Sequence, residues 1–495
     1  MDPDQEARLE EFKYFWKDFL EEQPGQCELM LAELELNRSC LRYLVKETRQ
    51  LPLEQRPRSL ILNSCKYHPT DGTANLMSKY FNDDLALTLK SVRLESAYVG
   101  HLPTPSATIL LQGLQQVSVL ESVQLVDIDL RPPTVAWQVP MLPRQCPQLQ
   151  NLEMRHCRVD EPFLQALGSA LFQEEDVYNI PYNHGNQKSQ KQQAQQSNYS
   201  TKDNYHHYFY YESTHQHQQQ QAKIRVTFHA CVMDDHLLHV FCNALDTNNC
   251  STLRQLSLPS NRFTHASIDT LATLLQNQPQ LQHLDLQRTS RLFSTTTNLD
   301  HRSSIHNFTK ALQSHGQLVQ LDLTRCGVTN PVAEALLRAL EHATCGVRDL
   351  NLSGNHELGL DDDGWMARLP HVAKLERLDL PKHSHNHASW YHEEETHEEN
   401  HHHHHHHHHT KNKNLLYYVQ QNTTLTALLH DGVPSAQAQS VLERNAWMKK
   451  ARECGLWNFG RALWPRVLQV YANQAQAQSA FYHALQEALS ENVAP

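Results

Sequence analysis

The chain has 495 residues, a formal net charge of −11 with its 35 histidines counted as neutral, and a pI of about 6.3. This acidic balance excludes a general nucleic-acid binder, which needs a basic surface, and no apolar run approaches the roughly 18 residues of a membrane span. The 11 cysteines include no C-x-x-C pair and the N-terminus carries no secretory signal, so we expect a cytoplasmic protein without membrane partners.

Residues 1–55 are predicted to form an N-terminal helical cap. We expect two helices within residues 4–50, because apolar side chains recur there between charged ones. The first repeat of a stacked array has no neighbour, so its open core needs a cover. A separate pair of partner-binding helices is the alternative. The apolar residues are Phe12, Phe15, Trp16, Phe19 and Leu20 in the first helix and Leu29, Leu31, Leu34 and Leu36 in the second.

A short apolar phrase recurs through residues 56–432. Its full form is L-x-x-L-x-L, as in Leu281-Gln-His-Leu284-Asp-Leu286, and the L-x-L part puts two leucines on one face of a strand. Most successive phrases are 28 to 32 residues apart, with helical spacing of apolar residues between them. Eleven strands are predicted, at Leu60, Val92, Val123, Leu152, Val226, Leu256, Leu284, Leu321, Leu350, Leu378 and Leu428.

Two long insertions interrupt this period. The step from Leu152 to Val226 is 74 residues and contains a Gln-rich tract, and the step from Leu378 to Leu428 is 50 residues and contains a tract rich in His and Glu. Low-complexity sequence of this kind cannot bury a core. We therefore predict disordered loops at 173–221 and 383–413.

A strand plus a helix in each repeat of about 28 residues resembles the ribonuclease-inhibitor-like class of leucine-rich repeats. The resemblance implies an α/β solenoid, a horseshoe arc with a parallel sheet inside and helices outside. In such repeats the residue three positions after the last apolar residue of the strand phrase is Asn or Cys, buried at the strand-to-helix turn. Burial is therefore expected in preference to redox or metal chemistry for Cys65, Cys157, Cys231 and Cys326.

Residues 433–495 are predicted to form a C-terminal helical cap. The segment carries the phrase Leu442-Glu-Arg-Asn445, then Leu463-Trp-Pro465 at a helix start, and then a helix with Phe481 and Leu485. This order is similar to the C-terminal tail of some microalgal leucine-rich repeat proteins. A cap over the last repeat is the physical interpretation.

Catalytic motifs are missing from the sequence. It contains no P-loop, no G-x-G-x-x-G after a strand, no G-x-S-x-G and no H-E-x-x-H, so we predict no enzyme activity and no cofactor. Repeats of this class also serve in regulators of GTPases and other enzymes. A regulator acting through a residue at the rim is therefore the alternative function.

A histidine run from His401 to His409 is the most distinctive local feature. Imidazoles at this density bind Zn²⁺, Ni²⁺ or Cu²⁺, so a weak divalent-metal site and a His-rich metal-binding protein are a further alternative. Repeat expansion in a tolerant surface loop is the simpler explanation. The candidate ligands are His401, His403, His405, His407 and His409.

The residue between the two leucines of each strand is expected to point to the concave face. In five successive strands these residues are Ser257, Asp285, Asp322, Asn351 and Asp379. We predict that they form a row that binds an unknown partner protein through a basic segment. The alternative is that L-D-L only solvates an exposed strand. The predicted function is a non-catalytic protein-interaction scaffold.

Overall fold

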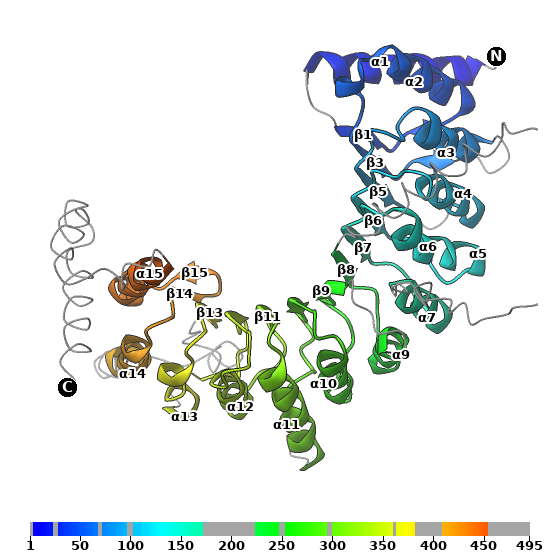
Figure 1. Ribbon diagram of the computed structural model, residues 1–495. Helices are drawn as coiled ribbons and strands as arrows, with labels where there is room; N and C mark the ends of the chain where they lie inside the picture. The colour runs from blue at the N-terminus through cyan, green and yellow to red at the C-terminus, as the bar shows by residue number, and fades with distance from the viewer. Residues whose placement is uncertain are drawn as a thin grey trace, which may run out of the picture.

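A computed structural model describes most of the chain (Figure 1). One long sheet with helices along one side makes up the molecule. Among the described helices, none has the length and apolarity needed to cross a bilayer. The described residues are 3–22, 28–67, 72–96, 102–171, 223–246, 253–294, 299–359, 363–381 and 408–453.

The sheet has 13 strands, and its spatial order follows the chain. Neighbouring strands are parallel throughout, except that β14 and β15 are antiparallel. A two-stranded sheet, β2 (Glu35–Leu36) with β4 (Lys66–Tyr67), is separate. The main strands are β1 (Glu28–Ala32), β3 (Ser59–Asn63), β5 (Ser91–Glu95), β6 (Ser122–Val126), β7 (Asn151–Arg155), β8 (Ile224–His229), β9 (Leu253–Ser257), β10 (His283–Asp285), β11 (Gln320–Asp322), β12 (Asp349–Asn351), β13 (Arg377–Leu380), β14 (Ala427–His430) and β15 (Val433–Pro434).

Helices alternate with these strands along the chain. They cover the outer side of the arc, and the strands line its inner side (Figure 1). The helices are α1 (Pro3–Glu22), α2 (Arg38–Gln50), α3 (Thr73–Asp83), α4 (Thr104–Leu114), α5 (Pro133–Ala136), α6 (Gln138–Gln145), α7 (Glu161–Ala170), α9 (Asp235–Asp246), α10 (Ser267–Asn277), α11 (Leu299–Ser314), α12 (Asn330–Leu340), α13 (Asp363–Met366), α14 (His408–Gln421) and α15 (Gln439–Glu453).

The arc is open and bends near its middle, where β8 and β9 meet (Figure 1). The pairing of these two strands contains a register shift between Ile224 and Arg225. An extra residue in one strand bends the sheet and increases its local twist, which accounts for the bend. An open parallel sheet with helices on its convex side is the architecture of a leucine-rich repeat solenoid, as predicted.

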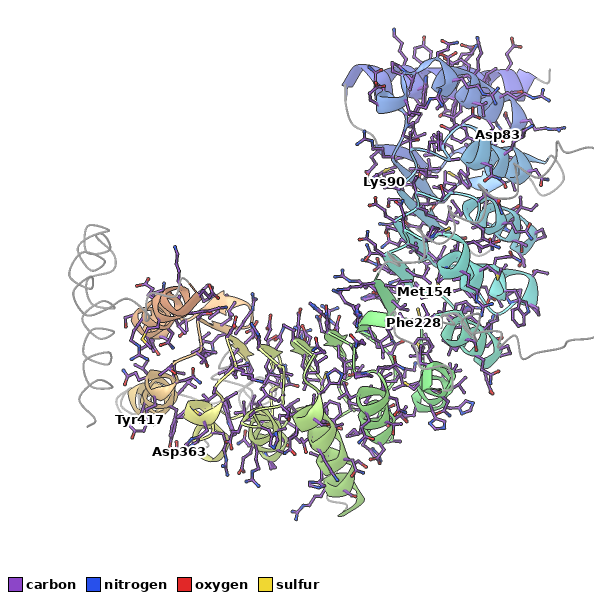
Figure 2. All side chains as sticks on the ribbon, viewed as in Figure 1. Asp83, Lys90, Met154, Phe228, Asp363 and Tyr417 are labelled. Carbon is purple, nitrogen blue, oxygen red and sulfur yellow. The ribbon has the colours of Figure 1, made fainter. Side chains whose placement is uncertain are left out.

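The two apolar residues of each strand phrase point away from the concave surface, into the layer between sheet and helices. Leu284 and Leu286 of one such phrase are almost fully buried. Met154 and Phe228 are also buried in this layer (Figure 2). Full burial of such a side chain contributes roughly 1.5–3 kcal/mol. Two such residues in every strand therefore bind the sheet to the helices along the whole arc.

The chain leaves most strands through a residue in the left-handed backbone conformation. Eight non-glycine residues at this template position have φ between 52° and 59°, and Gly354 takes the same place at 66°. This conformation costs a non-glycine residue about 1–2 kcal/mol, so packing and hydrogen bonds around the turn must hold it. The eight are Glu33, Ser64, Asp127, His156, Ala230, Ser260, Arg288 and Arg325.

The next residue of the turn points inward and bonds to the preceding repeat. Cys65, Cys157, Cys231 and Cys326 are buried, as predicted, and each thiol donates to a backbone carbonyl of the previous repeat at 3.0 to 3.4 Å. Burial raises the pKa of the Cys326 thiol to about 12, so the donor proton is retained at neutral pH. None of the eight described cysteines is in a disulfide.

The first fifty residues differ from the prediction of two helices alone. Residues Glu28–Ala32 form a strand, β1, whose Leu29 is the register partner of Leu60, so one more repeat precedes the predicted array. The second helix begins only at Arg38. Its start is fixed by Asn37, whose side-chain oxygen accepts from the N–H groups of the second and third following residues at 2.9 Å.

The two predicted disordered loops lie largely outside the described residues. The first, 173–221, does so entirely. The second, 383–413, is wrong at its end, because α14 already begins at His408. Helix α15 agrees with the helical pattern predicted after Pro434, whereas the later part of the proposed C-terminal cap, 454–495, lies outside the described residues.

Deleting residues 174–220 should leave the solenoid intact. Leu152 of β7 pairs in register with Val226 of β8 across this insertion. Shortening a loop changes closure entropy by only about 0.6 kcal/mol per twofold change in length. The thermal midpoint of the deletion variant should therefore move by less than about 4 °C. A drop beyond about 10 °C in differential scanning calorimetry would show that the segment packs against the repeats.

Replacing Asn355 with alanine should destabilise the C-terminal half strongly. This side chain is 2% exposed; its Nδ2 donates to the carbonyls of Leu323 and Leu352 at 2.9 and 2.7 Å, and its Oδ1 accepts from two backbone N–H groups. Removing this side chain leaves buried backbone N–H and carbonyl groups without hydrogen-bond partners, and each such group costs about 1–3 kcal/mol. We expect a loss of at least about 3 kcal/mol in urea unfolding. Cys326→Ser retains a donor and is the control; equal losses would contradict this role of Asn355.

Candidate functional site

The row predicted on the concave face is formed. Ser257, Asp285, Asp322, Asn351 and Asp379 are consecutive register partners across β9 to β13. Adjacent strands are about 4.8 Å apart, so the row extends over about 19 Å. The structure thus brings together all five predicted residues, and we refer to them as the acidic row. Their role in partner binding stays a prediction.

Three members of the acidic row also close the turn after their own strand. In each, the side-chain Oδ1 accepts a hydrogen bond of 3.0 Å from the backbone N–H two residues later. Asp and Asn favour this local turn, which explains why they recur at this template position. The three acceptors are Asp285, Asp322 and Asn351.

The remaining oxygens of the row connect neighbouring strands. Asp285 Oδ2 accepts from the Ser257 hydroxyl at 2.7 Å. Asp322 Oδ2 accepts from the side-chain amides of Gln287 and Asn351 at 2.9 and 3.0 Å. These bonds hold the carboxylates in fixed positions, so their charges are presented without the freedom of surface side chains.

Neutral groups alone bond to the three carboxylates of the row. Among the described residues, Asp285, Asp322 and Asp379 form no ion pair; Asp379 accepts from the backbone N–H of Gly432 at 3.0 Å. Burial raises the pKa of Asp285 and of Asp379, and the hydrogen bonds that each accepts act in the opposite direction. The row is therefore a line of hydrogen-bonded carboxyl groups without counter-ions.

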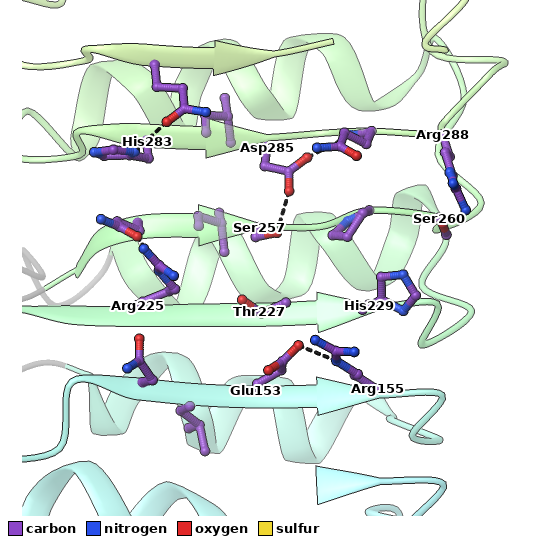
Figure 3. A pocket seen from close by; sticks show the side chains of 18 of the residues that line it. Glu153, Arg155, Arg225, Thr227, His229, Ser257, Ser260, His283, Asp285 and Arg288 are labelled. Atoms are coloured by element: carbon purple, nitrogen blue, oxygen red, sulfur yellow. Dashed lines mark hydrogen bonds and ion pairs between the residues drawn. The ribbon is translucent and has the colours of Figure 1, made fainter. Parts of the chain in front are cut away.

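A pocket of about 660 Å³ lies on the concave face at the bend of the arc (Figure 3). Its walls come from β6 to β11, and at one side it reaches Asp285 of the acidic row. The charged residues of its lining are three arginines and two carboxylates, which leaves one excess positive charge when the histidines are neutral. They are Arg155, Arg225, Arg288, Glu153 and Asp285.

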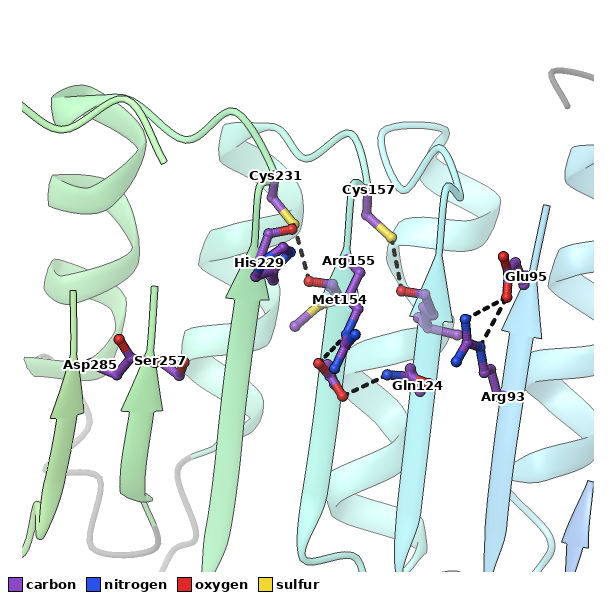
Figure 4. Close-up of polar contacts among 12 residues, drawn as sticks. Arg93, Glu95, Gln124, Met154, Arg155, Cys157, His229, Cys231, Ser257 and Asp285 are labelled. Carbon is purple, nitrogen blue, oxygen red and sulfur yellow. Dashed lines mark hydrogen bonds and ion pairs between the residues drawn. The ribbon is translucent and has the colours of Figure 1, made fainter. Parts of the chain in front are cut away.

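Both carboxylates of the pocket already accept hydrogen bonds from neighbouring side chains. Glu153 accepts from Gln124 Nε2 at 2.7 Å and from the guanidinium of Arg155 (Figure 4). Asp285 bonds within the acidic row. The guanidinium of Arg288, by contrast, is exposed and makes no hydrogen bond or ion pair to any described residue. The pocket thus contains a cationic donor that is available to a ligand.

The basic residues of this pocket were not predicted from the sequence, because the predicted binding residues all lie at the template position between the two leucines. Arg155 and His229 occupy the position directly after the second apolar residue of β7 and β8, and Arg288 occupies the left-handed position of the β10 turn. Basic residues at these two positions in neighbouring repeats were the signal that could have identified them.

The predicted metal ligands are not placed by the structure. His401, His403, His405 and His407 lie outside the described residues, and His409 lies in α14 with its side chain undescribed. Among the described residues, no group of three or more His, Cys, Asp or Glu side chains is arranged to hold a metal ion. Metal binding by the histidine run stays a prediction.

No model of a known protein family matches the chain, and no curated protein matches it either. The fold therefore rests on the repeat pattern and on the structure. A fold of this class hosts many functions, so the function has to be argued from the concave surface and its charges.

Replacing Asp285 with asparagine should stabilise the protein most at neutral pH. Burial raises the pKa of Asp285 above its ordinary value of 3.8, so the folded state holds its proton to a higher pH than the unfolded chain does. The ionised Asp285 carboxylate therefore destabilises the folded state above the raised pKa. This destabilisation is relieved as the pH falls through the raised pKa. Urea midpoints of wild type and Asp285→Asn should converge as the pH is lowered from 7 towards 4.

The matched control for this experiment is Asp83→Asn, an exposed carboxylate on α3 (Figure 2). Its substitution should shift stability little, and equally at both pH values. If Asp285→Asn is less stable than wild type at pH 7, the charge of Asp285 contributes favourably to folding and the argument from burial is wrong.

Proposed function

We propose that the protein is a non-catalytic scaffold of the ribonuclease-inhibitor-like class, which binds a basic segment of a partner protein on its concave face. The observation that carries this proposal is the register of the acidic row, in which three carboxylates without counter-ions face the same side of five adjacent strands. A line of like charges raises the energy of each of its members, so a cation placed over it is favoured.

The environment of the row also supports this proposal. Asp322 and Asp379 are only 6% and 4% exposed, so a partner would interact with these carboxylates through long-range electrostatics more than through direct contact with their oxygen atoms. Buried charges are screened less by salt than surface charges are. A basic segment would therefore gain from long-range attraction without having to displace the hydrogen bonds that hold the carboxylates.

The strand positions before the row supply the polar contacts that an extended segment needs. Gln255, His283, Gln320 and Asp349 are partly exposed there, and His283 Nδ1 lies 2.9 Å from Gln320 Oε1. At the end of this line Arg377 Nε lies 3.8 Å from Asp349 Oδ1. Burial raises the pKa of Asp349. Hydrogen bonds at these positions would fix where the bound segment lies on the sheet, and the acidic row would select a segment that is positively charged.

The triple variant Asp285→Asn, Asp322→Asn, Asp379→Asn should weaken binding of a labelled hexalysine peptide by about tenfold or more. Its binding should also depend less on salt concentration, because three charges are removed. The fold should persist, since Asn351 already makes the same turn with an amide at this template position. Fluorescence anisotropy from 20 to 300 mM salt measures both effects.

A charge-matched control is the triple variant Asp83→Asn, Glu161→Gln, Glu357→Gln, which removes three exposed carboxylates away from the row. It should bind hexalysine as the wild type does. Equal binding by wild type and the row variant, with the fold of both intact by circular dichroism, would move the partner site away from the row.

A further inference from the structure

We propose that the C-terminal ends of β7, β8 and β10 form a carboxylate-binding site, which accepts an acidic residue of the partner next to its basic segment. This inference rests on the proposed function and deepens it, because it gives the partner segment a mixed charge. The residues of the site are Arg155, His156, His229 and Arg288, which we refer to as the basic cluster. Three of them line the pocket at the bend.

The basic cluster comes from the ends of β7 and β8 and from the turn after β10, with β9 lying between β8 and β10. His229 ends β8, and its ring centroid lies 5.5 Å from that of His156, in an edge-on arrangement. Arg288 extends towards Ser260 and His229 from the turn after β10, and Arg155 lies beside His229 on β7 (Figure 3). The side chains thus converge on one edge of the pocket, although they come from repeats far apart in the sequence.

Charge balance favours a single carboxylate as the ligand. The pocket has one excess positive charge, and its own carboxylates, Glu153 and Asp285, remain close enough to oppose a group of higher negative charge. Arg288 has its guanidinium fork available, which matches the two oxygens of a carboxylate. The Ser260 hydroxyl lines the same edge and can donate a further hydrogen bond.

The ring of His229 gives the site a second donor. Its Nδ1 is closed off from solvent and has no hydrogen-bond partner among the described residues. A buried N–H without an acceptor is costly, so the neutral ring places its proton on Nε2. A carboxylate in the pocket can accept that proton in a hydrogen bond, whereas a cation cannot.

The same ring makes the site sensitive to pH. Burial lowers the pKa of His229, and the nearby His156 and the cations Arg155 and Arg288 lower it further, while Glu153 raises it. The turn after the neighbouring strand β9 contributes Pro259 and Ser260, which carry no charge. Protonation adds the second proton at the buried Nδ1, and this cost contributes to the low pKa of the empty site. A carboxylate bound at Nε2 would offset the cost by attraction to the positive ring, so binding should take up a proton and strengthen as the pH falls.

The basic cluster and the acidic row are close enough for one segment. From β8 to β11, the middle strand of the acidic row, there are three strand spacings, about 14 Å, and an extended chain covers about 3.3 Å per residue. About four residues therefore separate the middle of the basic cluster from the middle of the acidic row. A peptide that carries a glutamate block and a lysine block should engage both surfaces and bind more tightly than either block alone.

The test uses the full chain and three labelled peptides: hexaglutamate, hexalysine and a twelve-residue peptide that joins the two blocks. Arg288→Gln should weaken hexaglutamate binding about tenfold and leave hexalysine binding no weaker. His229→Gln should remove the increase in hexaglutamate affinity between pH 7.5 and 5.5. The joined peptide should lose affinity both in Arg288→Gln and in the Asn triple variant of the acidic row.

Two further variants separate a binding role from a structural one. Arg42→Gln removes an exposed arginine from α2, at the far end of the arc, and should leave hexaglutamate binding unchanged. Arg288→Lys keeps the charge but loses the fork, so it should retain more affinity than Arg288→Gln. Circular dichroism melting of each variant shows that the fold is kept.

The inference is overturned if wild type fails to bind hexaglutamate, or if Arg288→Gln and Arg42→Gln bind it equally well. It is also overturned if a phosphoserine peptide of equal length binds at the cluster while hexaglutamate does not, because the ligand would then be a phosphate. If the wild type binds hexalysine but not hexaglutamate, the carboxylate site is refuted and the proposed function stands. If the wild type binds hexaglutamate but not hexalysine, the proposed function is refuted and the carboxylate site remains as an isolated site.

Discussion

Six of the repeats are each fixed to the one before by a buried hydrogen bond at the strand-to-helix turn. The donor is a thiol at Cys65, Cys157, Cys231 and Cys326, and a side-chain amide at Asn261 and Asn355. An amide satisfies backbone N–H and carbonyl groups together, whereas a thiol provides only a weak donor. Without these bonds the carbonyls at the strand ends would be buried and unpaired, which the stacking energy of leucines alone would not offset easily.

This turn also determines where functional side chains can lie. The residue before the inward donor takes the left-handed conformation, which directs its side chain to the rim of the concave surface. The inward donor position thus serves stability. The left-handed position before it accepts any residue that tolerates a positive φ. His156 and Arg288 are such residues, and Gly354 is the one that adopts this conformation at little cost. The basic cluster depends on this division between adjacent positions.

The period of the sequence was sufficient to predict the sheet, its register and the acidic row. The first residue of the L-x-L pair in each phrase aligns with that of the next, from Leu60 through Leu428, and the row follows from the residue between the two apolar positions. Strand β1 was missed because Leu34 stands where later repeats have Cys or Asn, so the spacing from Leu31 to Leu34 was interpreted as helical.

The pocket could not be predicted in the same way. The register shift between β8 and β9 leaves Arg254 of β9 as an extra residue, and the phrase around Leu253 gives no sign of it. Glu153 pairs with Gln124 of the neighbouring strand and with Arg155 of its own strand, and both contacts depend on side-chain conformations that the period does not determine. Periodicity assigns each residue to a face of the sheet, but it does not say which charges on that face neutralise each other.

Strand length explains why the two charged surfaces lie side by side. Strands β3, β5, β6 and β7 have five residues each, whereas β10, β11 and β12 have three. In the short strands the chain turns directly after the row, so Gln287 can bond to Asp322 of the next repeat. In the longer strands the position after the second apolar residue still belongs to the sheet and points to the concave face, where Arg155 and His229 lie. The change from long to short strands therefore brings a basic edge against an acidic row at the bend, without any single residue serving both.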